Sequence, residues 1–267
     1  MALLHIDHTP QTVQVNLPLN VILPDPAEMG RTPMAQRKVL YLLHGLGDDA
    51  SAWQRYTSIE MVVARYGLVA VMPSVGRSFY VDQPNGQRYF AYLTEELPSY
   101  LADVFGLAPE REDTLIAGVS MGGYGAVKAA LLHPERYAAA ASLSGVLSLE
   151  ILRTHSDDPR RKEFAYLFGD LKQLRGSEHD PEVWLKRAAA TSGPLPRLYI
   201  ACGRQEDLYP LSGLFYAACK AAGVPAEYHE EDGHHDWFLW DRQIRHFLAA
   251  VLGPLPAEDA TQPRQAP

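Results

Sequence analysis

Hydrophobic positions follow two different patterns along the chain. From residue 13 to residue 23, apolar side chains occupy every second position, as in a strand that buries one face. Later runs at 38–43, 68–72, 114–117, 139–143 and 197–202 are apolar at nearly every position, which is typical of strands buried on both faces. The sequence therefore predicts one or two antiparallel strands at a sheet edge, with Asn16 or Pro18 marking a break, followed by parallel strands.

Helix-forming segments separate these runs. Helices are predicted over 57–66, with Ser58 as a cap, over 95–105, with Pro98 in the first turn, and over 126–132, 211–222 and 238–252. A short strand is predicted at 226–229. Strands that alternate with helices predict an α/β fold with a mostly parallel central sheet covered on both faces, in which ligands bind beyond the carboxyl ends of the strands.

One segment departs from this alternation. Residues 148–192 are rich in charges and helix formers and contain no clear strand, so we expect a small cap insertion there. Residues 1–252 are otherwise expected to form a single domain. Residues 253–267 are rich in Pro, Ala and polar residues and are predicted to be a flexible tail.

Charge and composition narrow the function. The 267 residues carry a net charge of −8 at pH 7, which disfavours nucleic acid and anionic membrane as general partners. Two cysteines imply no disulfide framework. The N-terminus lacks the basic start and apolar stretch of a signal peptide, and no run is long enough to span a membrane, so a cytoplasmic location is expected.

The motif at the centre of the chain is Gly118-Val119-Ser120-Met121-Gly122. It matches G-x-S-x-G, the nucleophile elbow, and stands between a predicted strand and a predicted helix, where that motif belongs. The tight turn places a serine hydroxyl beyond the sheet edge and directs the first N–H groups of the helix toward any negative charge beside it. Ser120 is therefore the predicted nucleophile.

A nucleophilic serine needs a base and an acid, which in this type of fold follow in the order acid, then His. The loop after the strand at 197–202 offers Asp207, our choice, and Glu206 as the alternative. The loop before the last helix offers His234 and His235, which spacing does not separate. A metal site built from these histidines, His229 and Asp236 lacks regular ligand spacing, and no metal or cofactor is expected.

Backbone donors and aromatic side chains complete the predicted site. The oxyanion hole is assigned to the N–H groups of Met121 and Leu46, the latter in the loop that begins with His44-Gly45. His44 itself is expected to be a structural hydrogen-bonding residue. The candidate pocket walls, which core packing would explain as well, are Trp53, Phe79, Tyr80, Tyr124 and Trp237.

These residues resemble the tributyrin esterase group, close to esterase D, of the α/β-hydrolases. The resemblance rests on motifs in chain order, namely 42–45 (LLHG), 72–80 (MPSVGRSFY), 95–98 (EELP), 118–126 (GVSMGGYGA), 142–145 (SLSG), 202–203 with 207–209, and 235–237 (HDW). It implies an α/β-hydrolase fold and serine-dependent hydrolysis of short-chain acyl esters. It also implies that the catalytic histidine is His235, which precedes Asp-Trp.

The expected activity is that of a serine carboxylesterase that acts on a small-molecule ester through an acyl-enzyme, with a Ser120–His235–Asp207 triad and no cofactor. Alternatives are an acetyl or feruloyl esterase acting on carbohydrate esters, and a thioesterase of the S-formylglutathione type. A non-enzymatic alternative is a silent α/β-hydrolase module that binds a ligand. Relatives often form homo-oligomers, and no segment of this sequence identifies an interface.

Overall fold

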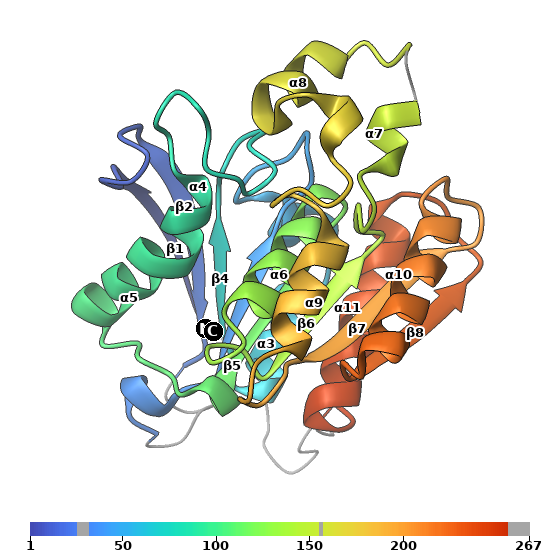
Figure 1. Cartoon of the computed structure of the whole chain (residues 1–267). Coiled ribbons are helices and arrows are strands. Elements are labelled where there is room, and N and C mark those ends of the chain that lie inside the picture. Colours follow the sequence, from blue (N-terminus) through green and yellow to red (C-terminus); the bar gives the residue numbers. More distant parts are fainter. Residues whose placement is uncertain (26–31, 155–156, 256–267) are drawn as a thin grey trace.

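A computed structural model describes residues 1–25, 32–154 and 157–255 of the protein, and its core is one eight-stranded sheet (Figure 1). From edge to edge the strands are β1 (Ala2–His8), β2 (Leu17–Leu23), β4 (Val69–Pro73), β3 (Val39–Leu43), β5 (Thr114–Val119), β6 (Ala139–Leu143), β7 (Arg197–Gly203) and β8 (Ala226–Glu231). The expected α/β fold with a mostly parallel sheet is confirmed.

The antiparallel part of the sheet lies at one edge, as predicted, but only β2 falls within the predicted segment 13–23, and β1 lies outside it. Strand β2 pairs antiparallel with both β1 and β4. The alternating pattern from residue 13 enters a strand only at Leu17, because Val13 and Val15 belong to the preceding turn. Val13 is nevertheless buried in the core while Val15 is 43% exposed, so burial does not follow the period of two in this segment, which has no strand pairing.

The other strands run parallel, and their order puts β3 and β5 at the centre. Alternate residues of these strands face opposite sides. In β3, Tyr41 and Leu43 belong to one core cluster, while Leu40 and Leu42 belong to the other. Continuous apolar runs are therefore required here, because both faces of each central strand are covered by helices.

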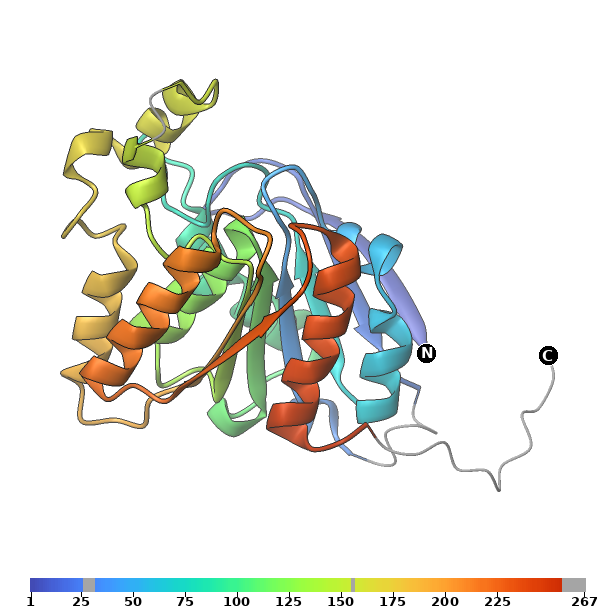
Figure 2. The same ribbon diagram turned by 90° about the vertical axis from the view of Figure 1, so that its right-hand side faces the viewer.

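Helices cover both faces of the sheet (Figure 2). One core cluster includes side chains of α5 (Leu97–Phe105), α6 (Met121–Leu132), α9 (Pro181–Ala189) and α10 (Tyr209–Ala222). The other includes side chains of α2 (Ala52–Tyr56), α3 (Ile59–Tyr66) and α11 (Trp237–Leu252). The short elements are η1 (Met34–Gln36), α4 (Tyr89–Ala91), the π-helical turn η2 (Tyr92–Glu96), η3 (Arg111–Asp113), α7 (Glu150–Thr154), α8 (Arg161–Phe168) and η4 (Leu171–Gln173).

The predicted helices are present, with differences at their N-terminal ends. Pro98 lies in the first turn of α5, as predicted, although Glu95 and Glu96 belong to the π-helical turn before it. Ser58 precedes α3, but its side chain does not cap that helix. Its hydroxyl and its N–H both donate to Oδ1 of Asp241 in α11, at 2.8 and 2.7 Å, and so connect the two helices.

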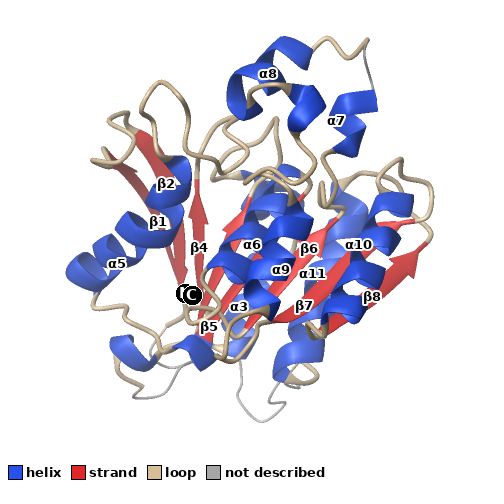
Figure 3. Cartoon of the chain, in the orientation of Figure 1, coloured by secondary structure: helices blue, strands red, loops and turns tan. Residues whose placement is uncertain are grey.

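The segment 148–192 lies partly above the carboxyl ends of the strands and partly beside the sheet. Figure 3 shows α7 and α8 beyond the strand ends, whereas α9 runs next to α6. Trp184 of α9 is fully buried against Tyr124 of α6, with ring centroids 4.8 Å apart. Only the first part of the segment is thus placed to cover a site at the strand ends.

Most of the tail predicted from residue 253 lies outside the described residues, which end at residue 255. Within the described ranges, no helix is both long and apolar enough to cross a membrane.

Candidate active site

Ser120 stands at the turn between β5 and α6, as the G-x-S-x-G motif predicts. Its backbone is left-handed, with φ 53° and ψ −116°, a strained conformation for a residue with a side chain. Its N–H donates to the carbonyl of Leu143 in the neighbouring strand β6, at 2.9 Å. The turn is therefore fixed by the sheet, and the hydroxyl is presented beyond the strand end.

The two glycines of the motif are required by close backbone approaches. A Cβ on Gly118 would lie 2.2 Å from the carbonyl oxygen of Gly122, and a Cβ on Gly122 would lie 2.4 Å from that of Leu43 in β3. Both distances are far below van der Waals contact. Only residues without a side chain allow α6 to begin this close to the strands.

His235 lies between β8 and α11, within hydrogen-bond distance of Ser120. Its Nε2 is 3.0 Å from the serine Oγ, and its Nδ1 is 2.6 Å from Oε2 of Glu206. A carboxylate only accepts hydrogen bonds, so Nδ1 carries the proton and Nε2 is free to accept the serine proton. His235 is the histidine that the resemblance implied, and His234 does not take part in these contacts.

The acid next to His235 is Glu206 and not Asp207, so our choice between the two is corrected. Both follow β7 in one turn, in which the Glu206 N–H donates to the Gly203 carbonyl at 3.2 Å. The Glu206 side chain folds back over the strand end and is 1% exposed. Neighbouring side chains in such a turn point in different directions. Asp207 is exposed, and no hydrogen bond joins it to His235.

The surroundings of Glu206 keep it ionised. Burial raises the pKa of its carboxyl, but hydrogen bonds from His235, from Ser144 Oγ and from the Gly203 N–H outweigh burial and leave the pKa below its ordinary value. Ser144 Oγ and the Gly203 N–H both reach Oε1, at 2.6 and 2.7 Å. The carboxylate is thus charged at neutral pH and held by three donors.

The two predicted oxyanion donors lie in segments that flank the serine. Met121 is the first residue of α6, where no carbonyl one turn earlier in the helix is available to its N–H. Leu46 follows β3 and lines the cavity in front of Ser120. Their N–H groups remain the predicted oxyanion hole.

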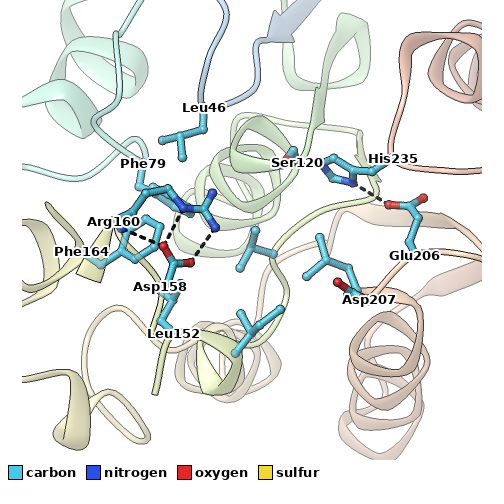
Figure 4. A pocket seen from close by; sticks show the side chains of 13 residues that line it. Leu46, Phe79, Ser120, Leu152, Asp158, Arg160, Phe164, Glu206, Asp207 and His235 are labelled. Carbon is cyan, nitrogen blue, oxygen red and sulfur yellow. Dashed lines mark hydrogen bonds and ion pairs between the residues drawn. The ribbon is translucent and has the colours of Figure 1, made fainter. Parts of the chain in front are cut away.

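A cavity of about 360 Å³ opens in front of Ser120 and His235 (Figure 4). The loops after β3, β4, β6, β7 and β8 form its walls together with the cap segment, residues 148–192. The lining residues are Leu46, Phe79, Ser120, Val146, Ile151, Leu152, Asp158, Arg160, Phe164, Glu206, Asp207, Leu208 and His235. The wall opposite the triad is therefore mainly apolar, with one ion pair, Asp158–Arg160, at 2.7 Å.

Comparison with known proteins agrees with this geometry. The family model described as "Putative esterase" matches residues 11–251. The chain belongs to this esterase family. It is 30% identical over 254 residues to the acetyl esterase of Caldicellulosiruptor saccharolyticus, an alignment that covers 91% of this chain and 96% of that protein.

Two solved structures from Staphylococcus aureus are also similar to this esterase. The fluorophosphonate-binding serine hydrolase FphF superposes with a TM-score of 0.85 at 33% identity, covering 94% of this chain and 98% of that one. The S-formylglutathione hydrolase FrmB superposes with a TM-score of 0.83 at 33% identity, and the alignment covers 94% of this chain and 100% of that one. The esterase is accordingly a carboxylic ester hydrolase of the serine type, and the silent binding module is set aside.

His44 has a structural place in the esterase, as expected. Its Nε2 accepts the N–H of Val75 at 3.0 Å, and its Nδ1 donates to the carbonyl of Gly45 at 2.7 Å. Burial lowers the pKa of His44 to about 4. The ring therefore stays neutral and connects the loop of Leu46 to the loop after β4.

Of the five predicted pocket walls, only Phe79 lines the cavity of the esterase. The expectation is wrong for the other four, whose rings pack within the protein. Three of them are fully buried, and each donates a hydrogen bond to a backbone carbonyl: Tyr80 to His44, Tyr124 to His179 and Trp53 to Leu43. Trp237 packs edge-on against Trp53 at 5.2 Å.

Sequence reasoning missed the apolar residues that the cap segment contributes to the cavity. Ile151, Leu152 and Phe164 reach the cavity from α7 and α8. Their spacing identifies helices but not the direction in which those helices face. Phe164 also contacts the Phe79 ring edge-on at 5.8 Å, so the cap and the loop after β4 close one wall together.

Two of the three histidines of the conceivable metal site have other partners. His229 faces Glu227 at 3.3 Å on β8, and His235 serves Ser120 and Glu206. Across the described part of the esterase, no three His, Cys, Asp or Glu side chains converge as metal ligands.

Proposed function

We propose that the protein hydrolyses short-chain acyl esters of small alcohols through a covalent acyl-enzyme. The observation that carries the proposal is the array of Ser120, His235 and Glu206 in front of a small, mainly apolar cavity. Such an array serves nucleophilic acyl transfer, because the serine has a base in contact and the base has an oriented acid.

In the first half of the reaction, Oγ of Ser120 attacks the carbonyl carbon of the ester and its proton passes to Nε2 of His235. The carbonyl electron pair moves to the oxygen, and the N–H groups of Leu46 and Met121 stabilise this oxyanion. When the carbonyl reforms, the C–O bond to the alcohol breaks. The alcohol leaves with the proton from Nε2, and the acyl group stays on Ser120.

In the second half, a water molecule takes the place of the alcohol. Nε2 accepts a proton from the water as its oxygen attacks the acyl carbon, and a second oxyanion forms in the same hole. Collapse of this intermediate breaks the bond to Oγ, which recovers the proton from Nε2, and the free acid departs. Glu206 stays ionised throughout and stabilises the imidazolium that forms twice.

Cavity size supports a short acyl chain. A volume of about 360 Å³ lies at the lower end of the range for small-molecule sites, roughly 300–1,000 Å³. Phe79, Phe164 and Leu152 close it opposite the serine. Acetyl to butyryl groups are the expected substrates, and longer chains would extend past this wall into solvent.

Initial rates on p-nitrophenyl esters of increasing acyl length test the proposal, with Ser120→Ala measured in parallel. We expect kcat/KM to be highest from acetyl to butyryl, to fall by about tenfold or more at octanoyl, and to vanish in the variant. A preference for long chains would contradict the cavity argument, whereas activity that survives in Ser120→Ala would contradict the nucleophile.

A thioester of the S-formylglutathione type is the second candidate, favoured by the similarity to the staphylococcal S-formylglutathione hydrolase. The same steps apply, with a thiol as the leaving group in place of the alcohol. Comparison of kcat/KM for S-formylglutathione and for p-nitrophenyl acetate separates the two. A ratio that favours the thioester by about tenfold or more would make it the better assignment.

Acetyl or feruloyl esters of carbohydrate form the remaining alternative, supported by the similarity to an acetyl esterase. Phe79 is the one predicted aromatic residue that lines the cavity and could contact a feruloyl ring. Rates on methyl ferulate and on acetylated xylose test these substrates. We expect acetylated xylose to be hydrolysed faster than methyl ferulate, since the cavity suits a small acyl group.

A further inference from the structure

Ser144 lies directly behind the catalytic acid, and the mechanism above assigns it no step. It follows β6, is fully buried, and has a left-handed backbone with φ 50°. Its N–H donates to the carbonyl of Ala201 in β7 at 2.7 Å, which fixes the turn to the neighbouring strand. A serine in this conformation costs stability, and such outliers gather where a side chain must be held in one place.

The hydrogen bonds of Ser144 have only one possible direction. Nε1 of Trp240, in α11, lies 2.9 Å from Ser144 Oγ, and an indole nitrogen only donates. The serine oxygen therefore accepts from Trp240. Its single proton is left for Oε1 of Glu206, 2.6 Å away, because a carboxylate only accepts.

Trp240 thereby connects to the site in two ways. Its N–H orients the Ser144 hydroxyl, and its ring meets the His235 ring edge-on, with centroids 4.9 Å apart. Trp240, Ser144, Glu206 and His235 thus form a closed set of contacts in which each partner restrains the next. The carboxylate cannot rotate without breaking the bonds to Oε1 from Ser144 and Gly203.

We propose that Ser144 and Trp240 are positioning residues for the hydrolysis, which hold Glu206 as the ionised partner of His235. This inference rests on the proposed function. A glutamate has one more rotatable bond than an aspartate, so its carboxylate needs more restraint. The Ser144 hydroxyl, itself oriented by Trp240, supplies that restraint in a buried place where each charge-assisted bond is strong.

Few other groups can exchange protons with Glu206. The neighbours that titrate are His235, from the loop before α11, and Cys202, from the end of β7. Burial, and then the charge of Glu206, raise the pKa of the Cys202 thiol to about 12, so it stays neutral. His235 is therefore the one described neighbour whose protonation is coupled to the charge of Glu206.

Ser144→Ala tests the proposal, with Ser142→Ala as the matched control. Ser142 is a buried serine two residues earlier, and its Oγ has no hydrogen-bond partner among the described residues. We expect Ser144→Ala to lower kcat by about 10- to 100-fold with little change in KM, the range that the loss of one bond to a charged group predicts. Ser142→Ala should retain the wild-type kcat.

The pH dependence of kcat/KM is the readout that a purely structural role would not move. Without the Ser144 proton the Glu206 carboxylate is less stabilised, so the pair holds its proton more strongly. The acidic limb of the profile should therefore move to higher pH in Ser144→Ala and stay in place in Ser142→Ala. An unshifted limb in both variants would overturn the proposal.

Two further variants separate positioning from stability. Ser144→Gly removes the hydroxyl but relieves the left-handed backbone, so it should reproduce the loss of kcat in a protein that is no less stable than Ser144→Ala. Trp240→Phe removes the donor to Ser144 while the serine keeps its bond to Glu206, so a smaller loss is expected. Wild-type kcat in Ser144→Gly would contradict the proposal.

Phosphonylation of Ser120 by a fluorophosphonate distinguishes this inference from the proposed function. Oγ displaces fluoride at phosphorus with the help of His235, and no particular ester is needed. If the wild type is labelled but hydrolyses no ester of the series, the assignment as a short-chain esterase fails. The labelling rate still tests Ser144, since the Ser144→Ala rate should fall about tenfold or more, and an unchanged rate would overturn its role.

Discussion

His44 and His235 each follow a strand of one sheet, and each uses both ring nitrogens, yet their chemistry differs. His44 is 1% exposed and lies between a carbonyl and a backbone N–H. The side chain of His235 is 41% exposed and lies between a carboxylate and a hydroxyl. A ring held between two backbone groups only connects loops, whereas a ring between an acid and a hydroxyl can move a proton.

Burial reinforces this difference. His44 has no charged partner within hydrogen-bond distance, so protonation would leave a cation in the core, and its pKa falls to about 4. A cation at His235 meets the Glu206 carboxylate 2.6 Å away. The partners of a histidine, more than its place at a strand end, thus decide whether it acts as a base.

Replacement of the nucleophile, which removes the hydroxyl partner of His235, is expected to have the largest effect on activity. Ser120→Ala should lower kcat by about 10⁴-fold or more, because no other hydroxyl is in contact with Nε2 of His235 among the described residues. Steady-state rates on p-nitrophenyl butyrate measure this. The variant should unfold at the wild-type denaturant concentration or above it, since alanine removes no packing.

Glu206→Gln and Asp207→Asn sharpen the assignment of the acid. Gln keeps the shape of Glu206 but lacks the charge that stabilises the imidazolium, so kcat should fall by about 10²- to 10⁴-fold. Asp207 lines the cavity but does not contact His235, so Asp207→Asn should change kcat by less than about twofold. Equal losses in the two variants would restore Asp207 as a candidate.

Replacement of His44 should change the pH dependence of stability. In the unfolded state His44 is protonated below about pH 6.5, whereas in the folded state it is protonated only below about pH 4. The stability that neutral His44 contributes is therefore present above pH 6.5 and is lost as pH falls toward 4, by about 3 kcal/mol.

His44→Gln should remove this pH dependence. Urea unfolding of the wild type and the variant at pH 4.5 and pH 7 measures it, and the difference between the proteins should shrink at the lower pH. The same measurement on His235→Gln is the control, because the His235 ring is partly exposed and is hydrogen-bonded to Glu206, unlike the buried ring of His44. A constant difference between pH 4.5 and 7 would contradict a buried neutral His44.

The smallest effect concerns chain length. Phe164→Leu shortens the apolar wall that the cap segment contributes, so kcat/KM for hexanoyl relative to acetyl should rise by about three- to tenfold. Tyr124→Phe is the matched control, because Tyr124 is an aromatic residue that the structure places outside the cavity. A change in acyl preference in the control would contradict this description of the pocket.

The sequence by itself determined the fold, the nucleophile and the region of each catalytic partner. Continuous apolar runs identified the central strands because both faces are covered, and G-x-S-x-G identified Ser120 because only glycines fit at positions 118 and 122. Chain order narrowed the acid to two neighbours and the base to two neighbours. Motif similarity then implied His235, which the geometry matches.

Only the tertiary structure decided between Glu206 and Asp207 and among the aromatic residues. Adjacent side chains of one turn point in different directions, and which of them meets His235 depends on the strand end below, where Gly203 and Ser144 hold the carboxylate. Aromatic residues suit a core and a pocket equally well, because both bury apolar surface. Their position is fixed by packing between segments distant in sequence, and a local pattern carries no information about that.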